Sequence, residues 1–357
     1  MTIDALAPGA TIGILGGGQL GRMLAVAASR LGFVAHIFDP DPASPAGQIA
    51  ATFTNAGYDD LAALTRFARS VDVVTYEFEN IPTAALDAIE AEAPIFPNRD
   101  ALAISQDRLT EKRWLAELGL TPAPFAEVED AASLTKALSE IGAPAILKTR
   151  RFGYDGKGQA QILTPDMAAT ALADMAGAPG VLEGFVAFSC EISVIGARGQ
   201  DGQVACYDPG ENTHESGILR TTQVPARISA ALRTDAVLVA SRILTALDYV
   251  GVMGVELFVT PEGLIVNEIA PRVHNSGHWT QDGCMIDQFE QHIRAIAGWP
   301  LGDGSRIADI EMENLIGDDM NRLAALRAEP ATAIHLYGKS QTRAGRKMGH
   351  VNRILSR

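Results

Sequence analysis

The spacing of apolar positions in the first hundred residues predicts strands that alternate with helices. Short apolar runs at 11–15, 34–38 and 71–76 have the length of buried strands. Between them, the stretches 19–31 and 59–69 place apolar residues three or four positions apart, as an amphipathic helix does. The apolar face of the earlier helix is formed by Leu20, Met23, Leu24, Ala27 and Leu31. This alternation favours a parallel sheet that is covered by helices.

The pattern changes after residue 98, where longer strands are mixed with helices. We expect a helix that is capped by Ser105 and runs to about Leu118. Asp201-Gly202 is a hairpin signal within a segment that is otherwise mostly strand. The remaining expected elements are strands at 145–151, 159–163, 181–207, 251–260 and 264–269 and a long helix at about 228–247. This order of elements predicts α/β and α+β structure. The length of 357 residues predicts two or three domains.

Composition and charge narrow the class of protein. Hydrophobic residues make up 47% and charged residues 20% of the chain, which is typical of a globular protein. A formal net charge of −14 repels phosphate backbones, so nucleic acid is not expected as a partner. Cys190, Cys206 and Cys284 form no C-x-x-C pair, which suits a reducing cytoplasm and argues against a zinc site. No signal peptide and no apolar run of about 18 residues is present, so we expect a soluble cytoplasmic protein.

A glycine-rich turn follows the first predicted strand. Residues 16–21 read Gly-Gly-Gly-Gln-Leu-Gly, a G-x-G-x-x-G pattern between strand and helix, and Asp39 ends the next strand. Backbone N–H groups at the start of a helix attract an anion, so the pattern indicates a dinucleotide-binding turn. Glycines also allow a helix to pack closely on a strand, and the motif alone leaves both interpretations open.

A second glycine-rich segment lies between two predicted strands and carries positive charge. Lys148 is followed by Arg150, Arg151 and the run Phe-Gly-Tyr-Asp-Gly-Lys-Gly-Gln at 152–159. Such a loop can fold its backbone over phosphates while lysine supplies charge. It is not a P-loop, because G-x-x-x-x-G-K-[ST] and a following helix are absent. The alternative is an exposed hairpin tip with solvated charges.

Glu256 and Glu268 are predicted to face each other across a hairpin. The loop of this hairpin, Pro-Glu-Gly at 261–263, is expected to contain three residues. In the register that such a loop sets, the two carboxylates lie about 5 Å apart on one face, which costs stability unless they are neutralised. A divalent cation with oxygen ligands would neutralise them, and Asn267 is placed to complete the site. A partly solvated pair at a sheet edge is the alternative.

A basic cluster lies near the end of this acidic chain. Lys339, Arg343, Arg346 and Lys347 fall within nine positions. The cluster indicates a site for a phosphorylated small molecule, and a solvated basic tail is the alternative.

Several segments together resemble a known family. They are GILGGGQLGRML, TYEFENI, KTRRFGYDGKGQ, GILRTT, NEIAPRVHNSGHWTQ and GRKMGH, and the similarity runs from the first strand to about Val351. They resemble the ATP-grasp enzymes of purine synthesis, and among these the 5-(carboxyamino)imidazole ribonucleotide synthetases. The resemblance implies an N-terminal Rossmann-like pre-ATP-grasp domain at 1–104 and an ATP-grasp domain at 105–300, with a small lid subdomain at about 123–187. A small β-rich C-terminal domain at 301–357 would complete the substrate site.

The resemblance also implies roles for individual residues. Nucleotide-binding positions of the family match Arg108, Lys148, Gly153, Tyr154, Asp155, Gly156, Lys157, Gly158, Gln159, Glu183, Gly184, Phe185, Val186, Glu191, His214, Asn267 and Glu268. Mg²⁺ ligands match Glu256 and Glu268, which agrees with the hairpin argument. Positions that bind the ribonucleotide match Gln19, Leu20, Glu77, Lys339, Arg346 and Lys347. The catalytic region around bicarbonate and the reacting amine matches Tyr154, Lys157, Arg272, His274 and Asn275, with Lys157 standing where many members carry arginine.

The implied reaction joins bicarbonate to 5-aminoimidazole ribonucleotide at the expense of ATP, with Mg²⁺ as cofactor. It yields N5-carboxyaminoimidazole ribonucleotide, ADP and phosphate through carboxyphosphate. The family commonly forms dimers, so a homodimer is expected, and no nucleic acid or membrane is expected as a partner. Alternatives are a Rossmann dehydrogenase that binds nicotinamide, an ATP-grasp ligase with another acceptor, and a sensor that binds ATP without turnover.

Overall fold

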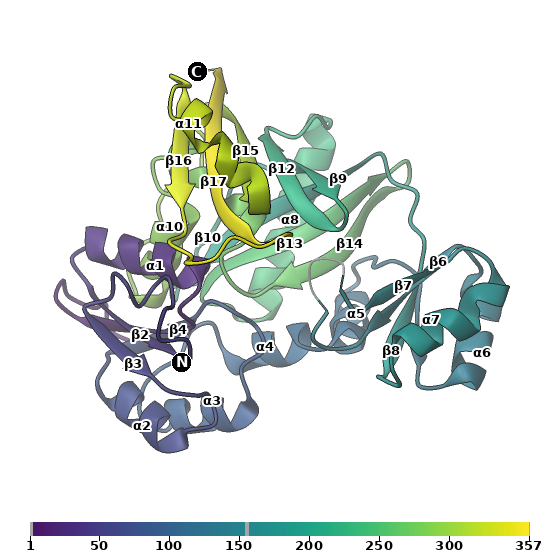
Figure 1. Ribbon diagram of the computed structural model, residues 1–357, viewed down its shortest axis with the longest axis horizontal. Helices are drawn as coiled ribbons and strands as arrows, with labels where there is room; N and C mark the ends of the chain where they lie inside the picture. Colours follow the sequence, from purple (N-terminus) through teal and green to yellow (C-terminus); the bar gives the residue numbers. More distant parts are fainter. Residues whose placement is uncertain (1–2, 154–156, 357) are drawn as a thin grey trace.

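The computed structural model describes residues 3–153 and 157–356 of the chain. The expected phosphate-binding residues Tyr154, Asp155 and Gly156 therefore lie outside the described residues. Figure 1 shows the N-terminal region at the lower left and a small region at the right, with a large sheet rising between them toward the C-terminus.

The N-terminal region contains a parallel four-stranded sheet with the order β3-β2-β1-β4. Its elements are β1 (Thr11–Leu15), α1 (Gln19–Arg30), β2 (Val34–Asp39), β3 (Thr52–Asn55), α2 (Leu61–Arg69), β4 (Val73–Tyr76) and α3 (Thr83–Glu90). The expected strands β1, β2 and β4 and the helices α1 and α2 are confirmed. The sequence did not predict β3, because this edge strand has four residues, none of them buried, and so has no continuous apolar run.

The small region at the right of Figure 1 is a separate sheet covered by two helices. Its strands lie in the order β5-β8-β6-β7 and are antiparallel. The elements are β5 (Phe125–Val128), α6 (Ala131–Ile141), β6 (Ala145–Thr149), β7 (Gln159–Ile162), η1 (Pro165–Met167), α7 (Ala168–Asp174) and β8 (Gly180–Gly184). Leu134, Leu147 and Leu182 belong to a core of its own. The region is therefore a packed unit with a hydrophobic core separate from that of the large sheet.

The remaining strands form one nine-stranded sheet. Its path is β14-β13-β9-β11-β12-β15-β17-β16, and β10 pairs with β9. The strands are β9 (Cys190–Arg198), β10 (Val204–Cys206), β11 (Gly210–Glu215), β12 (Ile218–Val224), β13 (Gly251–Thr260), β14 (Gly263–Ala270), β15 (Asp309–Ile316), β16 (Thr332–Leu336) and β17 (Lys347–Ser356). The shorter elements are η2 (Asn275–Gly277), α9 (Thr280–Gly283), α10 (Gln288–Ile296), η3 (Gly317–Arg322) and α11 (Leu323–Leu326). Because β15 pairs with β12, the C-terminal strands extend the sheet that contains β13 and β14.

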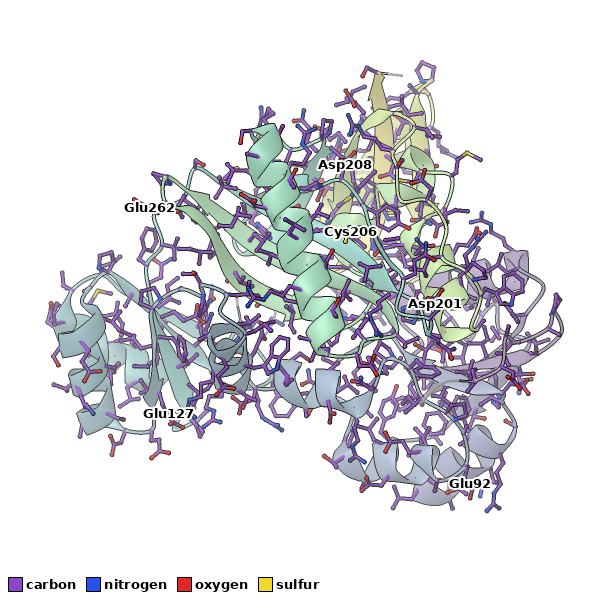
Figure 2. The ribbon with its side chains drawn as sticks, turned by 180° about the vertical axis from the view of Figure 1, so that it is seen from behind. Glu92, Glu127, Asp201, Cys206, Asp208 and Glu262 are labelled. Atoms are coloured by element: carbon purple, nitrogen blue, oxygen red, sulfur yellow. The ribbon has the colours of Figure 1, made fainter. Side chains whose placement is uncertain are left out.

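The expected long helix is confirmed as α8 (Ala230–Ala246), which lies across the rear face of this sheet (Figure 2). Ala236, Ala240 and Ile243 on its inner face are fully buried against β9 and β13. α8 has 17 residues and several charged positions. None of the helices in the described part of the chain has both the length and the apolar character that a membrane span requires.

The prediction that a helix runs from Ser105 to about Leu118 is wrong about where the helix begins. The structure has two helices there, α4 (Arg99–Ser105) and α5 (Arg108–Glu117), and Ser105 ends the first of them. Asp107 caps α5 because its carboxylate accepts hydrogen bonds from the backbone N–H groups of Leu109 (3.0 Å) and Thr110 (3.3 Å). Because α5 begins after Asp107, Arg108 lies in its first turn.

Candidate functional site

A cavity of about 580 Å³ lies where the three regions meet. Its wall comes from the glycine turn before α1, the loop after β4, the start of α5, strands β6 and β7, and strands β11 to β14. The start of β17 closes it on the C-terminal side. Segments that are far apart in the sequence therefore supply one site.

The structure brings most of the predicted site residues into this cavity. Those that line it are Gln19, Leu20, Glu77, Arg108, Lys148, Gly153, Lys157, Gln159, Glu191, His214, Glu256, Asn267, Glu268, Arg272, His274, Asn275 and Lys347. Predicted residues that lie outside the lining are Gly158, Glu183, Gly184, Phe185, Val186, Lys339 and Arg346. Their roles stay predictions, as do those of the lining residues.

Glu256 and Glu268 are direct cross-strand neighbours in β13 and β14. The register around them differs from the expected one, because Thr260 pairs with Gly263 and the loop therefore has two residues. A bulge between Glu256 and Leu257 then restores the pairing, with Asn267 as the additional residue of β14. Lys112 Nζ donates to the carbonyl of Asn267 at 3.4 Å and so links α5 to the bulge.

The two carboxylates differ in their surroundings. Arg108 Nη1 lies 2.8 Å from Glu268 Oε2, and although burial opposes ionisation, this arginine lowers the pKa of Glu268 to about 2. Burial and then the charge of Glu268 raise the pKa of Glu256 to about 7. Asn267 Nδ2 approaches Glu256 Oε2 at 3.4 Å. At neutral pH Glu268 is therefore ionised and Glu256 is partly protonated, and a cation bound between them would favour the ionised form of Glu256.

Lys148 is held at the cavity wall by a buried carboxylate. Its Nζ lies 3.0 Å from Glu183 Oε2, and Lys112 Nζ lies 3.1 Å from the same oxygen. Burial would raise the pKa of Glu183, but the two lysines lower it. Two ammonium groups share one carboxylate, so this group keeps a net positive charge beside the cavity.

The glycine turn before α1 is closed by carboxylates of the chain itself. Glu77 accepts hydrogen bonds from the backbone N–H groups of Gly18 and Gly21, the latter at 2.6 Å, and Asp39 accepts one from Gly17 at 2.6 Å. A side chain at Gly18 would collide with Glu77 Oε1. These N–H groups are the ones that would hold a pyrophosphate in a dinucleotide-binding turn. The geometry therefore argues against nicotinamide binding at this turn.

Arg272 is anchored from the N-terminal region. Its Nη2 lies 2.5 Å from Glu79 Oε1, and its Nη1 donates to the carbonyl of Val273 at 3.1 Å. Burial disfavours the guanidinium charge, but Glu79 raises the pKa of Arg272 overall. Asn275, close behind in the chain, has both amide atoms buried without a hydrogen-bond partner among the described residues. Both side chains belong to the cavity wall and suit a small polar substrate.

His274 is neutral in this site. Burial and then the charge of Arg272 lower its pKa to about 3. Nδ1 accepts hydrogen bonds from Ser276 N at 3.4 Å and from Ser276 Oγ at 2.8 Å, so the proton of the neutral ring must lie on Nε2. Nε2 is 3.5 Å from Glu256 Oε1. This histidine is therefore placed to orient Glu256.

His214 and Glu191 form a second pair in the cavity wall, where Nδ1 lies 2.5 Å from Glu191 Oε2. Burial would lower the pKa of His214, but the hydrogen bond and charge of Glu191 raise it.

The structure separates the members of the basic cluster. Lys347, at the start of β17, lines the cavity. Lys339 Nζ donates to the carbonyl of Lys347 at 2.7 Å, and Arg346 Nη1 donates to the carbonyl of Gln341 at 3.0 Å. Arg343 is exposed. The cluster thus presents one ammonium group to the cavity and uses others to hold the segment.

Sequence reasoning missed several residues of the wall, among them Glu79 and Glu111. Glu111 Oε1 accepts a hydrogen bond from Ile269 N at 2.8 Å, and burial followed by the charge of Glu268 raises its pKa to about 8. Arg150 pairs with Asp107 at 2.8 Å. Glu79 alternates with Glu77 directly after β4, and this spacing was a signal that the sequence offered for Glu79.

Comparisons with known proteins agree with this geometry. Residues 9–106 match the ribonucleotide synthetase preATP-grasp domain, 113–289 the ATP-grasp domain and 311–357 the phosphoribosylaminoimidazole carboxylase C-terminal domain. An N5-carboxyaminoimidazole ribonucleotide synthase of Brucella melitensis is 52% identical over 100% of this chain and 99% of its own.

Solved structures show the same fold. The ADP complex of an N5-carboxyaminoimidazole ribonucleotide synthetase superposes with a TM-score of 0.95 and 41% identity, covering 98% of this chain and 93% of that one. The enzyme of Aspergillus clavatus with ADP and 5-aminoimidazole ribonucleotide has a TM-score of 0.92 and 32% identity, covering 98% and 94%. The expected ATP-grasp fold is confirmed, and the chain belongs to the N5-carboxyaminoimidazole ribonucleotide synthases, ATP-grasp ligases of purine biosynthesis.

Proposed function

We propose that the protein carboxylates 5-aminoimidazole ribonucleotide with bicarbonate, in a reaction driven by ATP. The observation that carries the proposal is the placement of three kinds of group in one cavity. The pair Glu256 and Glu268 lies beside the cations Lys148 and Arg108, and Lys347 lies in the same wall. The arrangement suits a nucleotide triphosphate at one end and a phosphorylated acceptor at the other.

The nucleotide end is formed by β6, β7 and α5. Lys148 and Arg108 supply positive charge for the phosphates, and the backbone around Gly153 lies within reach because Arg108 Nη2 donates to its carbonyl at 3.3 Å. Closure of the β5-β8-β6-β7 sheet over the phosphates would keep water from a reactive intermediate. The relative in complex with ADP supports ATP as the co-substrate.

The pair Glu256 and Glu268 fits Mg²⁺. Two carboxylates and the Asn267 amide give oxygen ligands, which this ion prefers. No group of three or more His, Cys, Asp or Glu side chains among residues 3–153 and 157–356 is placed to hold a metal. Mg²⁺ is usually held by one or two carboxylates together with substrate phosphates, so the two glutamates suffice. When bound, it would neutralise charge on the ATP phosphates.

The acceptor end lies between the glycine turn and β17. Gln19 and Leu20 follow the turn that Glu77 closes, and Lys347 faces the same cavity. A relative in complex with 5-aminoimidazole ribonucleotide supports this substrate. Arg272 and Asn275 line the same cavity and are our candidates for binding bicarbonate, which has to meet both ATP and the amine.

The chemistry needs two transfers. A bicarbonate oxygen attacks the γ-phosphorus of ATP, ADP leaves, and carboxyphosphate forms. The exocyclic amine of the ribonucleotide then attacks the carboxyl carbon, the C–O bond to phosphate breaks, and the amine loses a proton. Holding these groups in line and stabilising their charge is the main task of the protein.

We propose that the amine proton passes to the departing phosphate. His274 is unsuited as the base, because its pKa is about 3 and its Nε2 already carries a proton. Its contact with Glu256 gives it a positioning role instead. Residence in the cytoplasm stays a prediction from the sequence composition, and a homodimer stays a prediction from the family resemblance.

The experiment is a set of assays for ADP release and for incorporation of labelled bicarbonate. We expect both only when ATP, bicarbonate and 5-aminoimidazole ribonucleotide are present together. Equal ADP release with another phosphorylated amine would favour an ATP-grasp ligase with a different acceptor. Binding of ATP with no release of ADP under any condition would favour a nucleotide sensor.

A further inference from the structure

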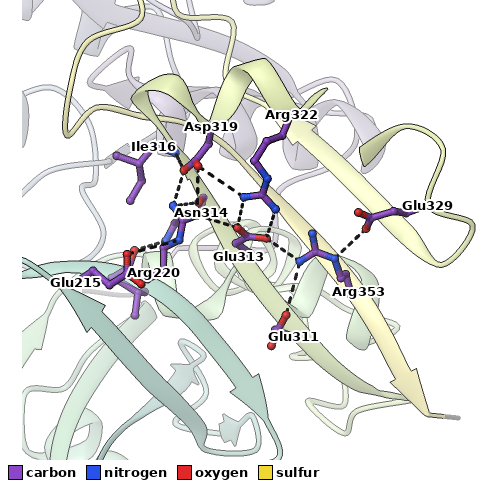
Figure 3. A network of polar contacts seen from close by, with 11 residues as sticks. Glu215, Arg220, Glu311, Glu313, Asn314, Ile316, Asp319, Arg322, Glu329 and Arg353 are labelled. Carbon is purple, nitrogen blue, oxygen red and sulfur yellow. Dashed lines mark hydrogen bonds and ion pairs between the residues drawn. The ribbon is translucent and has the colours of Figure 1, made fainter. Parts of the chain in front are cut away.

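An ion-pair network joins β12, β15 and β17 at the C-terminal end of the large sheet (Figure 3). Arg220 of β12 is at one side of it and Arg353 of β17 at the other, and both contact Glu313 of β15. Arg220 Nη2 lies 2.9 Å from Glu313 Oε1, and Arg353 Nη1 lies 2.8 Å from Glu313 Oε2. The two arginine side chains are similarly buried, with 20% and 22% exposure. None of these residues lines the cavity.

The two arginines differ in their other partners, which include Glu215 for Arg220 and Glu311 for Arg353. Arg220 also holds both carboxylate oxygens of Asp319 in η3, and its Nη1 donates to the carbonyl of Asn314 at 3.3 Å. Arg353 instead contacts Glu329 at 3.0 Å. Of these two arginines, Arg220 is therefore the one that reaches η3, and it connects η3 with β12.

Through Asp319, Arg220 fixes the turn that begins η3. Asp319 Oδ2 accepts a hydrogen bond from Ile316 N at 2.9 Å, and Gly317 N donates to the carbonyl of Arg346 at 2.9 Å. Gly317 has φ of +52°, and a Cβ there would lie 3.1 Å from the Arg343 carbonyl oxygen. The turn is thus packed directly on the basic segment 343–347.

The segment in turn carries Lys347 into the cavity wall. Lys347 pairs with Ile316 at the start of β17, directly beside the turn. Gly217 and Leu219, which closely precede Arg220 in the chain, line the same cavity. Arg220 therefore links two parts of the wall, one formed by Gly217 and the start of β12 and the other by the start of β17.

We propose that Arg220 is a positioning residue for the phosphate of the acceptor substrate, acting through Asp319 and the Gly317 turn on Lys347. The proposal rests on the proposed function, since it needs a phosphorylated acceptor at Lys347. A displacement of a charged ligand by about 1 Å can cost a large factor in rate, whereas a partly exposed ion pair contributes little to stability. Loss of the Arg220–Asp319 contact should thus weaken acceptor binding more than folding.

The test compares Arg220→Lys and Asp319→Asn with the matched control Arg353→Lys. Arginine to lysine keeps the charge but removes the bidentate geometry. For Arg220→Lys and Asp319→Asn we expect KM for 5-aminoimidazole ribonucleotide to rise about tenfold, with KM for ATP within about twofold. For Arg353→Lys both constants should stay within about twofold. Melting temperatures identify any variant that has lost its fold.

Two further measurements separate positioning from general damage. With the riboside that lacks the 5′-phosphate, wild type and Arg220→Lys should have equal kcat/KM, because the misplaced group contacts only the phosphate. In a Lys347→Ala background the effect of Arg220→Lys should fall to about twofold or less.

The proposal is overturned if Arg220→Lys and Arg353→Lys have equal effects on KM for 5-aminoimidazole ribonucleotide. It is also overturned if Arg220→Lys lowers kcat/KM for the riboside as much as for the ribonucleotide. Should Asp319→Asn alone fail to fold, the comparison of Arg220→Lys with Arg353→Lys decides. A wild-type protein that does not use the ribonucleotide at all would refute the proposed function instead.

Discussion

Glu256 and Glu268 face each other across β13 and β14 because Asn267 bulges out of the strand between Val266 and Glu268. Without this bulge, the register at the hairpin end would place Asn267 opposite Glu256. The bulge therefore brings two carboxylates together at a cost that burial increases. Such an arrangement is typical of functional sites, where an unfavourable pair of charges is kept because it binds a ligand.

The first prediction concerns this pair. Glu268→Gln and Glu256→Gln should each lower kcat by about 100-fold or more, because one charged oxygen ligand for Mg²⁺ is lost. Steady-state assays at several Mg²⁺ concentrations measure the change. Glu262→Gln, at the exposed turn of the same hairpin (Figure 2), is the control and should be unchanged. Near-normal turnover of Glu268→Gln at ordinary Mg²⁺ would contradict a metal role.

The second prediction concerns Arg272. Glu79→Gln removes the charge that holds its guanidinium at 2.5 Å. KM for bicarbonate should rise about tenfold, and KM for ATP should stay within about twofold, because only the arginine loses its position. The partly exposed ion pair of Glu90 with Arg99 offers a control, since Glu90→Gln should change neither constant. An equal rise of both constants in Glu79→Gln would show that the loop after β4 has a general structural role.

The sequence predicts much of this site because its signals are local. Apolar runs mark β1, β2, β4, β13 and β14, and charge patterns single out Lys148 and Lys347. The pairing of Glu256 with Glu268 was predicted correctly from a wrong loop length, since the two-residue loop and the bulge compensate. A bulge depends on contacts such as that of Lys112 with the Asn267 carbonyl, which hydrophobic periodicity does not encode.

The parts that could not be predicted depend on contacts between distant segments. Arg272 and Glu79 are 193 positions apart, and Arg150 pairs with Asp107 from another region. The cap of α5 was misplaced at Ser105 because Asp107 follows closely and either side chain is a suitable cap. The ion pair with Arg150 and the cap hydrogen bonds make Asp107 the one that is used.

A third prediction separates the members of the basic cluster. Lys347→Ala should raise KM for 5-aminoimidazole ribonucleotide by about 30-fold, since a lost charge-assisted phosphate contact costs about 2 kcal/mol. Arg346→Ala should have a smaller effect, because the guanidinium is directed to the Gln341 carbonyl and lies outside the cavity wall. Titrations of both substrates measure the difference. Equal effects of the two variants would mean that the whole segment moves to bind phosphate.

The last prediction concerns pH and stability. His292 of α10 connects the N-terminal sheet to the large sheet, since Nε2 lies 2.7 Å from Thr75 Oγ1 and Nδ1 accepts a hydrogen bond from Val252 N at 3.1 Å. Because Nδ1 is the acceptor, the neutral ring carries its proton on Nε2, and burial lowers the pKa of His292 to about 3. The unfolded chain takes up a proton at His292 near pH 6.5, whereas the folded protein does not.

The direction in which stability changes with pH follows from this difference in proton binding. The contribution of His292 is fully present above pH 6.5 and is lost as the pH falls toward about 3, at about 1.4 kcal/mol per pH unit. In His292→Gln, an amide can replace both hydrogen bonds without titrating. The slope of the free energy of unfolding against pH should therefore be smaller in this variant, by the amount that about one bound proton contributes. Urea unfolding at pH values from 7.5 to about 5 measures both slopes. Parallel curves for the two proteins would mean that His292 titrates equally in the folded and unfolded states, contrary to its burial between the two sheets.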